Sequence, residues 1–369
     1  MARVVVAMSG GVDSSVTAAL LVEQGHEVIG VHMKLHDAAP GSEPGTCCGL
    51  DDAIDARRVA DRLGIPFYVM NLREAFQKAV IDDLTDTYLA GRTPNPCIQC
   101  NGVLKFKVLL ARAMALGATH LATGHYARIE DGALHRAVDA HKDQTYFLFP
   151  MTPMALERTW FPLGGMTKAE VREHARRFDL LTAEKAESQD VCFLPEGDHA
   201  RFIAEQRPEA DTAGEIVDEA GRVLGYHDGY VRYTVGQRRG LGVALGFPAY
   251  VLRIEPETKR VVVAPKNRLE HRGLQASRAT WFDRPDPDRT VLARVRHNGG
   301  LTPCSVDVDG QDGSFSVRFH EPVLAVAPGQ AVVFYEGDRV LGGAWIQRAL
   351  HTWIPEHALS GRSGAEVHP

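Results

Sequence analysis

Two cysteines, Cys97 and Cys100, lie close together in a chain of 369 residues that contains six cysteines. They occupy the segment TPNPCIQCNGVLKFK, in which a stiff proline turn precedes a pattern of helical spacing. Half of a zinc site, a redox disulfide, a pair of iron–sulfur ligands and a single nucleophile beside a bystander all fit this spacing. A thiol just before a helix, with Lys105 and Lys107 nearby, is expected to have a lowered pKa, which favours a thiolate nucleophile.

The remaining cysteines are Cys47, Cys48, Cys192 and Cys304. So few cysteines in a chain of this length do not make a disulfide scaffold, so metal or catalytic roles are the better interpretation. No second C-x-x-C is present, and the adjacent Cys47 and Cys48 match the spacing of a zinc site poorly. Cys192, taken alone in ESQDVCFLP, is typical of a buried structural cysteine.

The segment AMSGGVDSS, residues 7–15, follows a short β-branched run and opens a helical pattern. Its glycines let the backbone approach an anion, and the N-terminus of the helix offers free N–H groups. Asp13 is informative, because a carboxylate in a phosphate loop is expected to hold Mg²⁺ against the phosphates. The alternative is a Gly-Gly turn with Asp13 as an ordinary helix cap. The strand and helix on either side favour the phosphate loop.

A third motif, ATGHYARI, ends another expected strand. His125 should therefore project from the same edge of the sheet as the phosphate loop. A lone histidine near a strand end is more often structural. Beside a phosphate loop it becomes a candidate for substrate contact or acid–base chemistry.

The elements that position these motifs alternate between strand and helix, which predicts an α/β fold with a parallel, doubly wound sheet. Ligands of such sheets bind at the carboxyl ends of the strands. Strands are expected at 3–8, 27–34, 66–72 and 120–124, and helices at 13–24, 51–63, 74–90 and 103–116.

The second half of the chain has a different pattern. Thr167 and Glu170 have capping-box spacing at the start of a helix, and from about residue 210 short β-rich segments dominate. Hairpin signals at Asp309-Gly310, Asp312-Gly313 and Glu336-Gly337 predict a small C-terminal β-barrel. We therefore expect a catalytic domain at 1–205, a small central α+β domain at 206–285, a β-barrel domain at 286–355 and a disordered tail at 356–369.

Composition narrows the class of protein. A hydrophobic fraction of 44% and a charged fraction of 24% are typical of a soluble globular protein. The net charge of −6 gives no general attraction to nucleic acid, so an RNA partner would need a local basic surface. No apolar run approaches the roughly 20 residues needed to span a membrane, and no signal-peptide pattern is present. We expect a cytoplasmic protein without a membrane partner.

The phosphate loop resembles the SGGxDS loop of the N-type ATP pyrophosphatases, which transfer AMP to an acceptor oxygen and release pyrophosphate. Taken together, the motifs resemble one family, the bacterial tRNA-specific 2-thiouridylases, over nearly the whole chain. The matching segments are AMSGGVDSS, VHMK, GRTPNPCIQCNGVLKF, ATGHYARI, HKDQTYFL, ESQDVCFLP, RYTVGQRRGLG and RFHEPVLAVAPGQAVVFYEGDRVLGGAWI.

This resemblance implies ATP-dependent 2-thiolation of the wobble uridine of tRNA on a fold like that of the adenine nucleotide alpha hydrolases. ATP activates the C2 oxygen with loss of pyrophosphate, a cysteine persulfide delivers sulfur, and AMP leaves. ATP and Mg²⁺ are the implied cofactors, tRNA and a persulfide sulfur-donor protein the implied partners, and we expect a monomer. The implied ATP-binding residues are Ala7, Met8, Ser9, Gly10, Gly11, Val12, Asp13, Ser14, Met33 and Gly124.

By the same resemblance, Cys100 matches the nucleophile and Cys192 the persulfide carrier, and the two are expected to close a redox disulfide. Some members of the family carry Asp at the position of Cys97, where it could act as an acid–base group; the change to Cys leaves that role open. Cys97, Cys100 and Cys192 also permit a second interpretation, as three thiolate ligands of a four-iron four-sulfur cluster.

The implied RNA contacts fall in two groups. Asn95, Pro96 and Cys97 match the segment around the target base, which must be flipped out to expose its C2 carbonyl. The other matched tRNA contacts are His125, Lys142, Asp143, Gln144, Arg296, His297 and Gln330, with His297 standing where the family usually has Tyr. Arg232, Arg238 and Arg239 add a local basic cluster suited to phosphates.

Two other classes of function share some of these features. GMP synthetase, argininosuccinate synthase and NAD synthetase carry the SGGxDS loop, but they need neither paired reactive cysteines nor a C-terminal barrel. A non-catalytic RNA-binding protein with a structural metal at the cysteines would not need the Asp13 loop.

Overall fold

The computed structural model describes residues 1–36, 50–186, 191–194, 198–307 and 313–352. Cys47, Cys48, the tail at 356–369 and the start of ESQDVCFLP lie outside the described residues. The chain forms two compact units. Unit 1 comprises residues 1–86, 95–208 and 337–340, and unit 2 comprises residues 87–94, 209–336 and 341–369. The predicted division at 205/206 and 285/286 stays a prediction.

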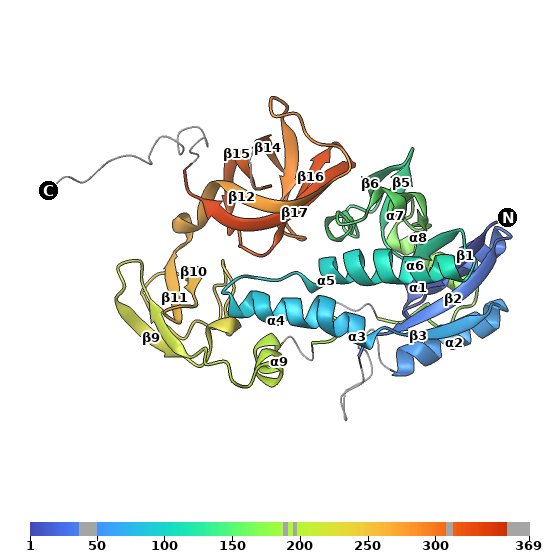
Figure 1. Ribbon diagram of the computed structural model, residues 1–369, viewed down its shortest axis with the longest axis horizontal. Coiled ribbons are helices and arrows are strands. Elements are labelled where there is room, and N and C mark those ends of the chain that lie inside the picture. Colours follow the sequence, from blue (N-terminus) through green and yellow to red (C-terminus); the bar gives the residue numbers. More distant parts are fainter. Residues whose placement is uncertain (37–49, 187–190, 195–197, 308–312, 353–369) are drawn as a thin grey trace. The chain divides into compact units, whose positions relative to one another are not determined.

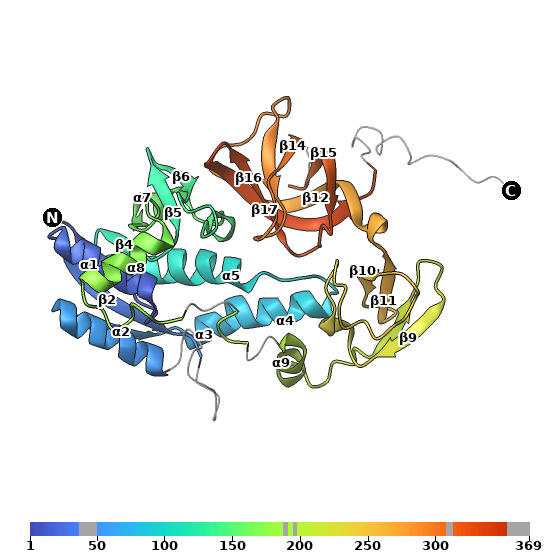
Figure 2. The same cartoon turned by 180° about the vertical axis from the view of Figure 1, so that it is seen from behind.

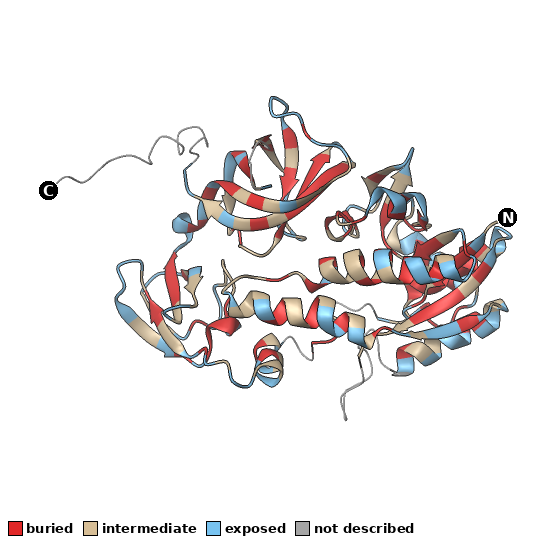
Figure 3. Ribbon diagram, viewed as in Figure 1, coloured by how far each residue is buried: buried red, intermediate tan, exposed pale blue. Residues whose placement is uncertain are grey.

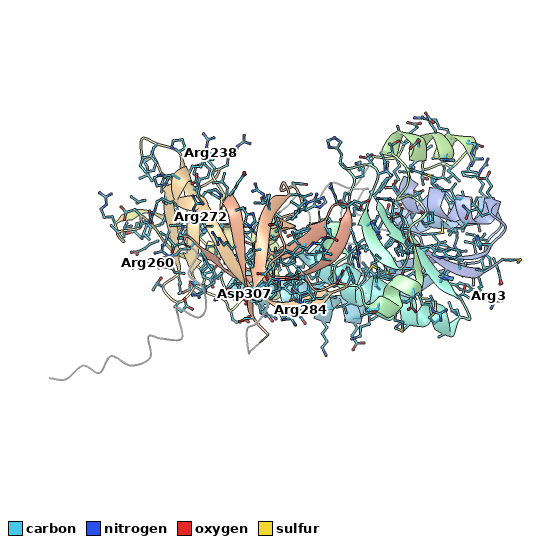
Figure 4. All side chains as sticks on the ribbon, turned by 90° about the horizontal axis from the view of Figure 1, so that it is seen from above. Arg3, Arg238, Arg260, Arg272, Arg284 and Asp307 are labelled. Carbon is cyan, nitrogen blue, oxygen red and sulfur yellow. The ribbon has the colours of Figure 1, made fainter. Side chains whose placement is uncertain are left out.

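Unit 1 is built on a five-stranded parallel sheet in the order β3-β2-β1-β4-β7 (Figure 1). The central strand β1 buries three consecutive valines, as a strand covered on both faces does. Arg3 lies at the outer margin of the sheet and pairs with Glu27 (Figure 4). The strands are β1 (Arg3–Ala7), β2 (Glu27–Lys34), β3 (Phe67–Asn71), β4 (His120–Thr123) and β7 (Thr159–Trp160).

Helices α1 (Val12–Glu23), α2 (Leu50–Leu63) and α8 (Lys168–Arg177) contribute to the apolar core around this sheet. The capping box predicted at Thr167 is confirmed: its hydroxyl accepts from the Glu170 backbone, and the Glu170 carboxylate accepts from the Thr167 backbone. The α/β fold class predicted from the alternating pattern is confirmed.

Two long helical runs lie side by side in both views (Figures 1 and 2). The first is α3 (Arg73–Phe76), the π-helical η1 (Gln77–Ile81) and α4 (Asp82–Leu89); the second is α5 (Pro96–Gln99), the π-helical η2 (Cys100–Leu109) and α6 (Leu110–Ala115). The second run starts at Pro96, because Pro at the first helical position costs no hydrogen bond. Cys97 and Cys100 therefore lie inside the helical run, which corrects the expectation of a loop before a helix.

The rest of unit 1 consists of short elements. They are the hairpin β5 (Ala127–Glu130) and β6 (Ala133–Arg136), the 3₁₀ turn η3 (Thr145–Phe147), and helices α7 (Pro153–Glu157) and α9 (His199–Gln206). No helix of the described residues is long and apolar enough to cross a membrane.

Unit 2 contains a small sheet in the order β10-β11-β8-β9. Its strands are β8 (Gly214–Val217), β9 (Val223–His227), β10 (Ala249–Glu255) and β11 (Arg260–Pro265), with 3₁₀ turns η5 (Tyr230–Arg232) and η6 (Lys266–Leu269). Arg232, Arg238 and Arg239 are exposed in this region, and Arg238 lies at its outer margin (Figure 4).

The C-terminal strands close into the predicted β-barrel, because β12 pairs with both β15 and β17. Buried residues of its strands form an apolar core (Figure 3). The partly buried Trp281 packs against Phe315 and Phe334, with ring centroids 5.4 and 5.3 Å apart. Gly337 adopts φ 61° at the predicted hairpin, whereas residues 308–312 lie outside the described part. The strands are β12 (Glu270–Trp281), β13 (Val291–Arg294), β14 (Thr302–Asp307), β15 (Phe315–Leu324), β16 (Ala331–Glu336) and β17 (Arg339–Leu350), so the barrel includes a strand before residue 286.

Candidate active site

The loop of residues 7–14 joins the end of β1 to the start of α1, as the sequence predicted. Gly10 has φ +81°, and a Cβ there would lie 2.2 Å from the Asp52 carbonyl oxygen, so only glycine fits. The backbone N–H of Ser9 donates to Ser14 Oγ at 3.1 Å, and Ser15 Oγ donates to the Gly11 carbonyl at 2.8 Å. The loop is therefore held in shape by its own hydroxyls at a helix N-terminus, where an anion is favoured.

The Asp13 carboxylate contacts two side chains that are distant in sequence, Tyr126 and Lys168. Lys168 Nζ lies 2.7 Å from Oδ1 and 2.9 Å from Oδ2, and the Tyr126 hydroxyl donates to Oδ1 at 2.8 Å. Both Asp13 oxygens face an ammonium in this structure. The expected contact between Asp13 and a magnesium ion stays a prediction.

A second lysine holds the other side of the loop. Lys185 Nζ donates to the Gly10 carbonyl at 3.1 Å and contacts Asp52 Oδ1 and Asp55 Oδ2, each at 2.7 Å. Burial lowers the pKa of Lys185, but the hydrogen bonds and charges of Asp52 and Asp55 outweigh it and raise the pKa overall. Lys168 and Lys185 were absent from the sequence prediction, since neither belongs to a recognisable motif.

The edge of β4 lies directly against the loop. Ala7 pairs with Thr123 in register, and a Cβ on Gly124 would lie 2.9 Å from the Asp13 carbonyl carbon and the Ser14 nitrogen. Gly124 is therefore placed beside the loop, as predicted. Met33 is half-buried near the end of β2, opposite Met70 of β3.

His125 projects from this edge, but its side chain is buried. Its Nδ1 lies 2.6 Å from Thr123 Oγ1, and its Nε2 lies 3.3 Å from Lys105 Nζ. Burial, and secondarily the charge of Lys105, hold the pKa of His125 well below 6.5. The imidazole is thus neutral at physiological pH, with Nε2 accepting from Lys105 and Nδ1–H donating to Thr123.

Cys100 is the first residue of η2, where a wide turn of the helix begins. Burial raises the pKa of the Cys100 thiol to about 12; Lys105 opposes this shift, whereas Cys192 and Cys97 add to it. The predicted lowering of the Cys100 pKa is therefore wrong for this structure, because desolvation of the thiolate exceeds the attraction of Lys105. The thiols of Cys97 and Cys192 are close enough to affect Cys100 electrostatically.

The neighbour of Cys192, Phe193, lies among aromatic rings. Its ring packs edge-on against Phe76, with ring centroids 5.2 Å apart, and is tilted against Phe202 of α9, with centroids 5.6 Å apart. Cys97 is exposed, Cys100 and Cys192 are half-buried and Cys304 is buried, and all four are thiols here. The predicted disulfide between Cys100 and Cys192 thus stays a prediction.

The cluster interpretation has no support in this geometry. Within the residues that the structure describes, no three His, Cys, Asp or Glu side chains converge as a metal site. Such convergence describes the ligands of a single metal ion, so the four-iron four-sulfur interpretation of Cys97, Cys100 and Cys192 stays a prediction.

The residues matched to the target base and to tRNA in unit 1 have mixed exposure. Asn95 caps α5, with its Oδ1 accepting from the Ile98 N–H at 3.3 Å, and Pro96 is buried. Lys142 is half-buried, whereas the Asp143 carboxylate is fully buried and accepts from Arg136 at 3.1 Å and Thr145 at 2.7 Å. Asp143 therefore supports its segment from inside. Gln144 accepts from the Tyr126 N–H at 2.9 Å, next to His125.

The matched residues of unit 2 lie in the barrel. Gln330 Nε2 donates to the carbonyls of Thr93 at 3.3 Å and Pro94 at 2.8 Å, so it holds the segment that leads to Asn95. Arg296 is exposed and His297 is half-buried, beyond the end of β13.

Known protein families match this chain along most of its length. The family profile described as "tRNA methyl transferase HUP domain" matches residues 2–196. The profiles "tRNA methyl transferase PRC-barrel domain" and "Aminomethyltransferase beta-barrel domain" match residues 200–265 and 271–346. A relative named "tRNA-specific 2-thiouridylase MnmA", from Geobacter metallireducens, is 54% identical over 94% of this chain and 97% of its own length. The chain belongs to the tRNA-specific 2-thiouridylase family.

Other 2-thiouridylases align over a similar extent. The protein of the same name from Geotalea uraniireducens is 52% identical over 95% of this chain and 96% of its own length. That from Rhodospirillum centenum is 49% identical over 94% of this chain and 92% of its own length. Among solved structures, "a 4-thiouridine synthetase - RNA complex with bound ATP" aligns with a TM-score of 0.35 and 18% identity over 56% of this chain and 51% of that chain.

Proposed function

We propose that this chain catalyses ATP-dependent 2-thiolation of the wobble uridine of tRNA. The relatives at about half identity carry the name of that activity. The observation that best supports it is that the Cys192 thiol lies close enough to Cys100 to raise the pKa of Cys100, although the two are distant in sequence. Both lie in unit 1, which also holds the phosphate loop.

The first step is activation of the uridine. The C2 oxygen is a poor leaving group, and transfer of AMP from ATP to this oxygen makes it a good one. Attack of the oxygen on the α-phosphorus breaks the bond to the β-phosphate, and pyrophosphate leaves. The loop N–H groups and the N-terminus of α1 suit a bound pyrophosphate. Gly124 and Met33 are the proposed adenosine contacts. ATP arrives as a magnesium complex, but no step here is assigned to the metal.

The second step is sulfur transfer. A persulfide anion on Cys192, supplied by a donor protein, attacks C2; the C2–O bond breaks and AMP leaves. Cys100 then attacks the Cys192 sulfur, which breaks the S–S bond to the base and releases the 2-thiouridine as its thiolate. The product on the enzyme is a Cys100–Cys192 disulfide, so an external dithiol must supply two electrons before the next turnover.

The high pKa of Cys100 means that this thiol must lose its proton before it attacks Cys192. At neutral pH the buried thiol is protonated. Its attack therefore requires transfer of its proton as the site fills. We propose that Cys100 reacts slowly until the substrates bind.

The RNA partner is proposed to present a flipped-out base at Asn95, Pro96 and Cys97. Lys142 and Arg296 are proposed phosphate contacts, and His125, Asp143, Gln144 and Gln330 are proposed to support the surfaces that contact tRNA. His297 is proposed to stack or hydrogen-bond where relatives have Tyr.

The function is tested with purified chain, ATP, a tRNA transcript that has a wobble uridine, and a persulfidated donor. Nucleoside mass spectrometry should detect 2-thiouridine, with one pyrophosphate and one AMP per thiolated base. Cys100→Ala should abolish thiolation and leave ATP binding intact, whereas Cys304→Ala, in the barrel, should leave thiolation intact. Full thiolation by Cys100→Ala would remove Cys100 from the mechanism.

A further inference from the structure

The proposed chemistry gives no role to Lys168, whose ammonium contacts Asp13. Asp13 lies in the loop proposed to bind pyrophosphate, and a bare carboxylate there would repel the phosphates. Lys168 Nζ contacts both of its oxygens, at 2.7 and 2.9 Å. The positive charge beside Asp13 in this structure thus belongs to a side chain, at the place where the sequence predicted a magnesium ion.

The backbone of Lys168 is anchored independently of Asp13. Lys168 is the first residue of α8, behind the capping box of Thr167 and Glu170. Its backbone N–H donates to Asp139 Oδ2 at 3.1 Å. Because these contacts fix the main chain, the four-carbon side chain can change partner without moving the helix.

The surroundings of Lys168 and Asp13 favour an interaction of Lys168 with bound ATP. The Lys168 side chain is 13% exposed and that of Asp13 is 32% exposed, so the charges are only partly screened by water. The Lys168 ammonium also lies 5.7 Å from the centre of the Tyr126 ring, whose hydroxyl donates to Asp13. Lys168, Tyr126 and Asp13 thus form one polar group on the face of the loop next to Gly124.

We propose that Lys168 is a catalytic residue that contacts the pyrophosphate portion of ATP and leaves Asp13 when the nucleotide binds. This inference rests on the proposed use of ATP. The several negative charges of a triphosphate attract the ammonium more strongly than one carboxylate does, and its three N–H donors suit phosphate oxygens. In the empty enzyme Lys168 neutralises Asp13; in the filled enzyme it stabilises the charge that develops on the leaving pyrophosphate.

The test compares ligands that differ in the phosphates that Lys168 would contact. Isothermal titration measures binding of ATP, pyrophosphate and AMP to the full-length chain, with and without magnesium. Lys168→Met should weaken the binding of ATP and of pyrophosphate by about tenfold or more, which is the contribution of a charge-assisted hydrogen bond. It should change the affinity for AMP by less than about twofold. Lys168→Arg should recover most of the loss. An equal loss for AMP, or no loss for pyrophosphate, would overturn the proposal.

Asp13→Asn should change the affinity for pyrophosphate in the opposite direction to Lys168→Met. Without magnesium it should tighten pyrophosphate binding, because it removes the repulsion and releases Lys168 from its partner. Weaker binding there would contradict the exchange of partners. If Lys168→Met alone fails to fold, the double variant Asp13→Asn/Lys168→Met removes the unpaired carboxylate and is compared with Asp13→Asn. Failure of the wild-type chain to bind ATP would refute the proposed function itself. If the wild-type chain binds ATP and the variants bind ATP and pyrophosphate with unchanged affinity, only the role of Lys168 is refuted.

Discussion

Lys185 Nζ donates a hydrogen bond of 3.1 Å to the carbonyl oxygen of Gly10. The same ammonium joins Asp52 and Asp55, and the other Asp52 oxygen, Oδ2, is buried without a partner among the described residues. One lysine therefore holds the phosphate loop against the start of α2.

Replacing Lys185 should destabilise the fold. Lys185→Met leaves the Asp52 carboxylate buried without its ion pair, which should cost about 2 kcal/mol after allowance for the partial exposure of the lysine. Urea unfolding followed by circular dichroism measures this loss. Asp52→Asn/Lys185→Met should recover part of it, and equal stability of Lys185→Met and wild type would contradict the anchoring role.

A methyl group on Gly124 should disrupt the loop. Gly124→Ala places a Cβ 2.9 Å from the backbone of Asp13 and Ser14, which must shift. We expect a loss of about 1–3 kcal/mol in stability, together with weaker ATP binding. Gly165→Ala is the matched control, because a Cβ there meets nothing within 4 Å. The inference about this contact fails if both variants behave alike in urea unfolding and nucleotide titration.

The cysteines should differ sharply in reactivity toward iodoacetamide. Cys97 is exposed, whereas burial raises the pKa values of Cys100 and Cys304 to about 12. At pH 7.5 Cys97 should be alkylated first, with Cys100 about a thousandfold slower than an ordinary thiol. Lys105→Met should slow Cys100 further, because Lys105 lowers its pKa. Peptide mass spectrometry follows each site, and rapid labelling of Cys100 would show that its burial is not maintained in solution.

Mild oxidation should link Cys100 to Cys192. Diamide takes two electrons from a pair of thiols, and the two side chains that meet most readily become joined. Non-reducing peptide mapping should identify this linkage, with Cys97→Ser giving the same product. A dominant Cys97–Cys192 disulfide would instead assign the resolving role to Cys97.

Stability should decrease as the solution becomes acidic. Burial holds the pKa values of His32, His125 and His271 below 6.5, and that of His271 falls to about 4. The unfolded chain binds these protons first, so the stabilisation is complete above pH 6.5 and is lost as the pH falls toward the folded-state values. For His271, a shift from 6.5 to about 4 corresponds to a loss of about 2 kcal/mol at pH 5. Urea midpoints at pH 7.5 and pH 5 measure the slope, which His271→Leu should reduce; an unchanged midpoint would show that these imidazoles are solvated.

Local patterns in the sequence were enough to predict the α/β fold and the C-terminal barrel. The valines of β1, the glycines of the loop and the capping box at Thr167 act over a few residues, so their spacing predicts a strand, a turn and a helix start directly. The Glu336-Gly337 turn and the β-rich segments likewise predicted the barrel. The motif that opens at Ala7 predicted the loop between β1 and α1.

Tertiary structure decided the partners and the protonation states. The contact of Lys168 with Asp13 joins two helices that are far apart in the chain, and no pattern of spacing specifies it. Lys105 and the preceding turn suggested a reactive thiolate at Cys100, yet the surrounding side chains exclude water and raise its pKa instead. Burial and charge pairing depend on what the fold packs around a side chain. Motif spacing therefore indicated the loop of residues 7–14, Gly124 and the cysteines, whereas only the folded chain brought Lys168 and Lys185 to the loop and determined the charges.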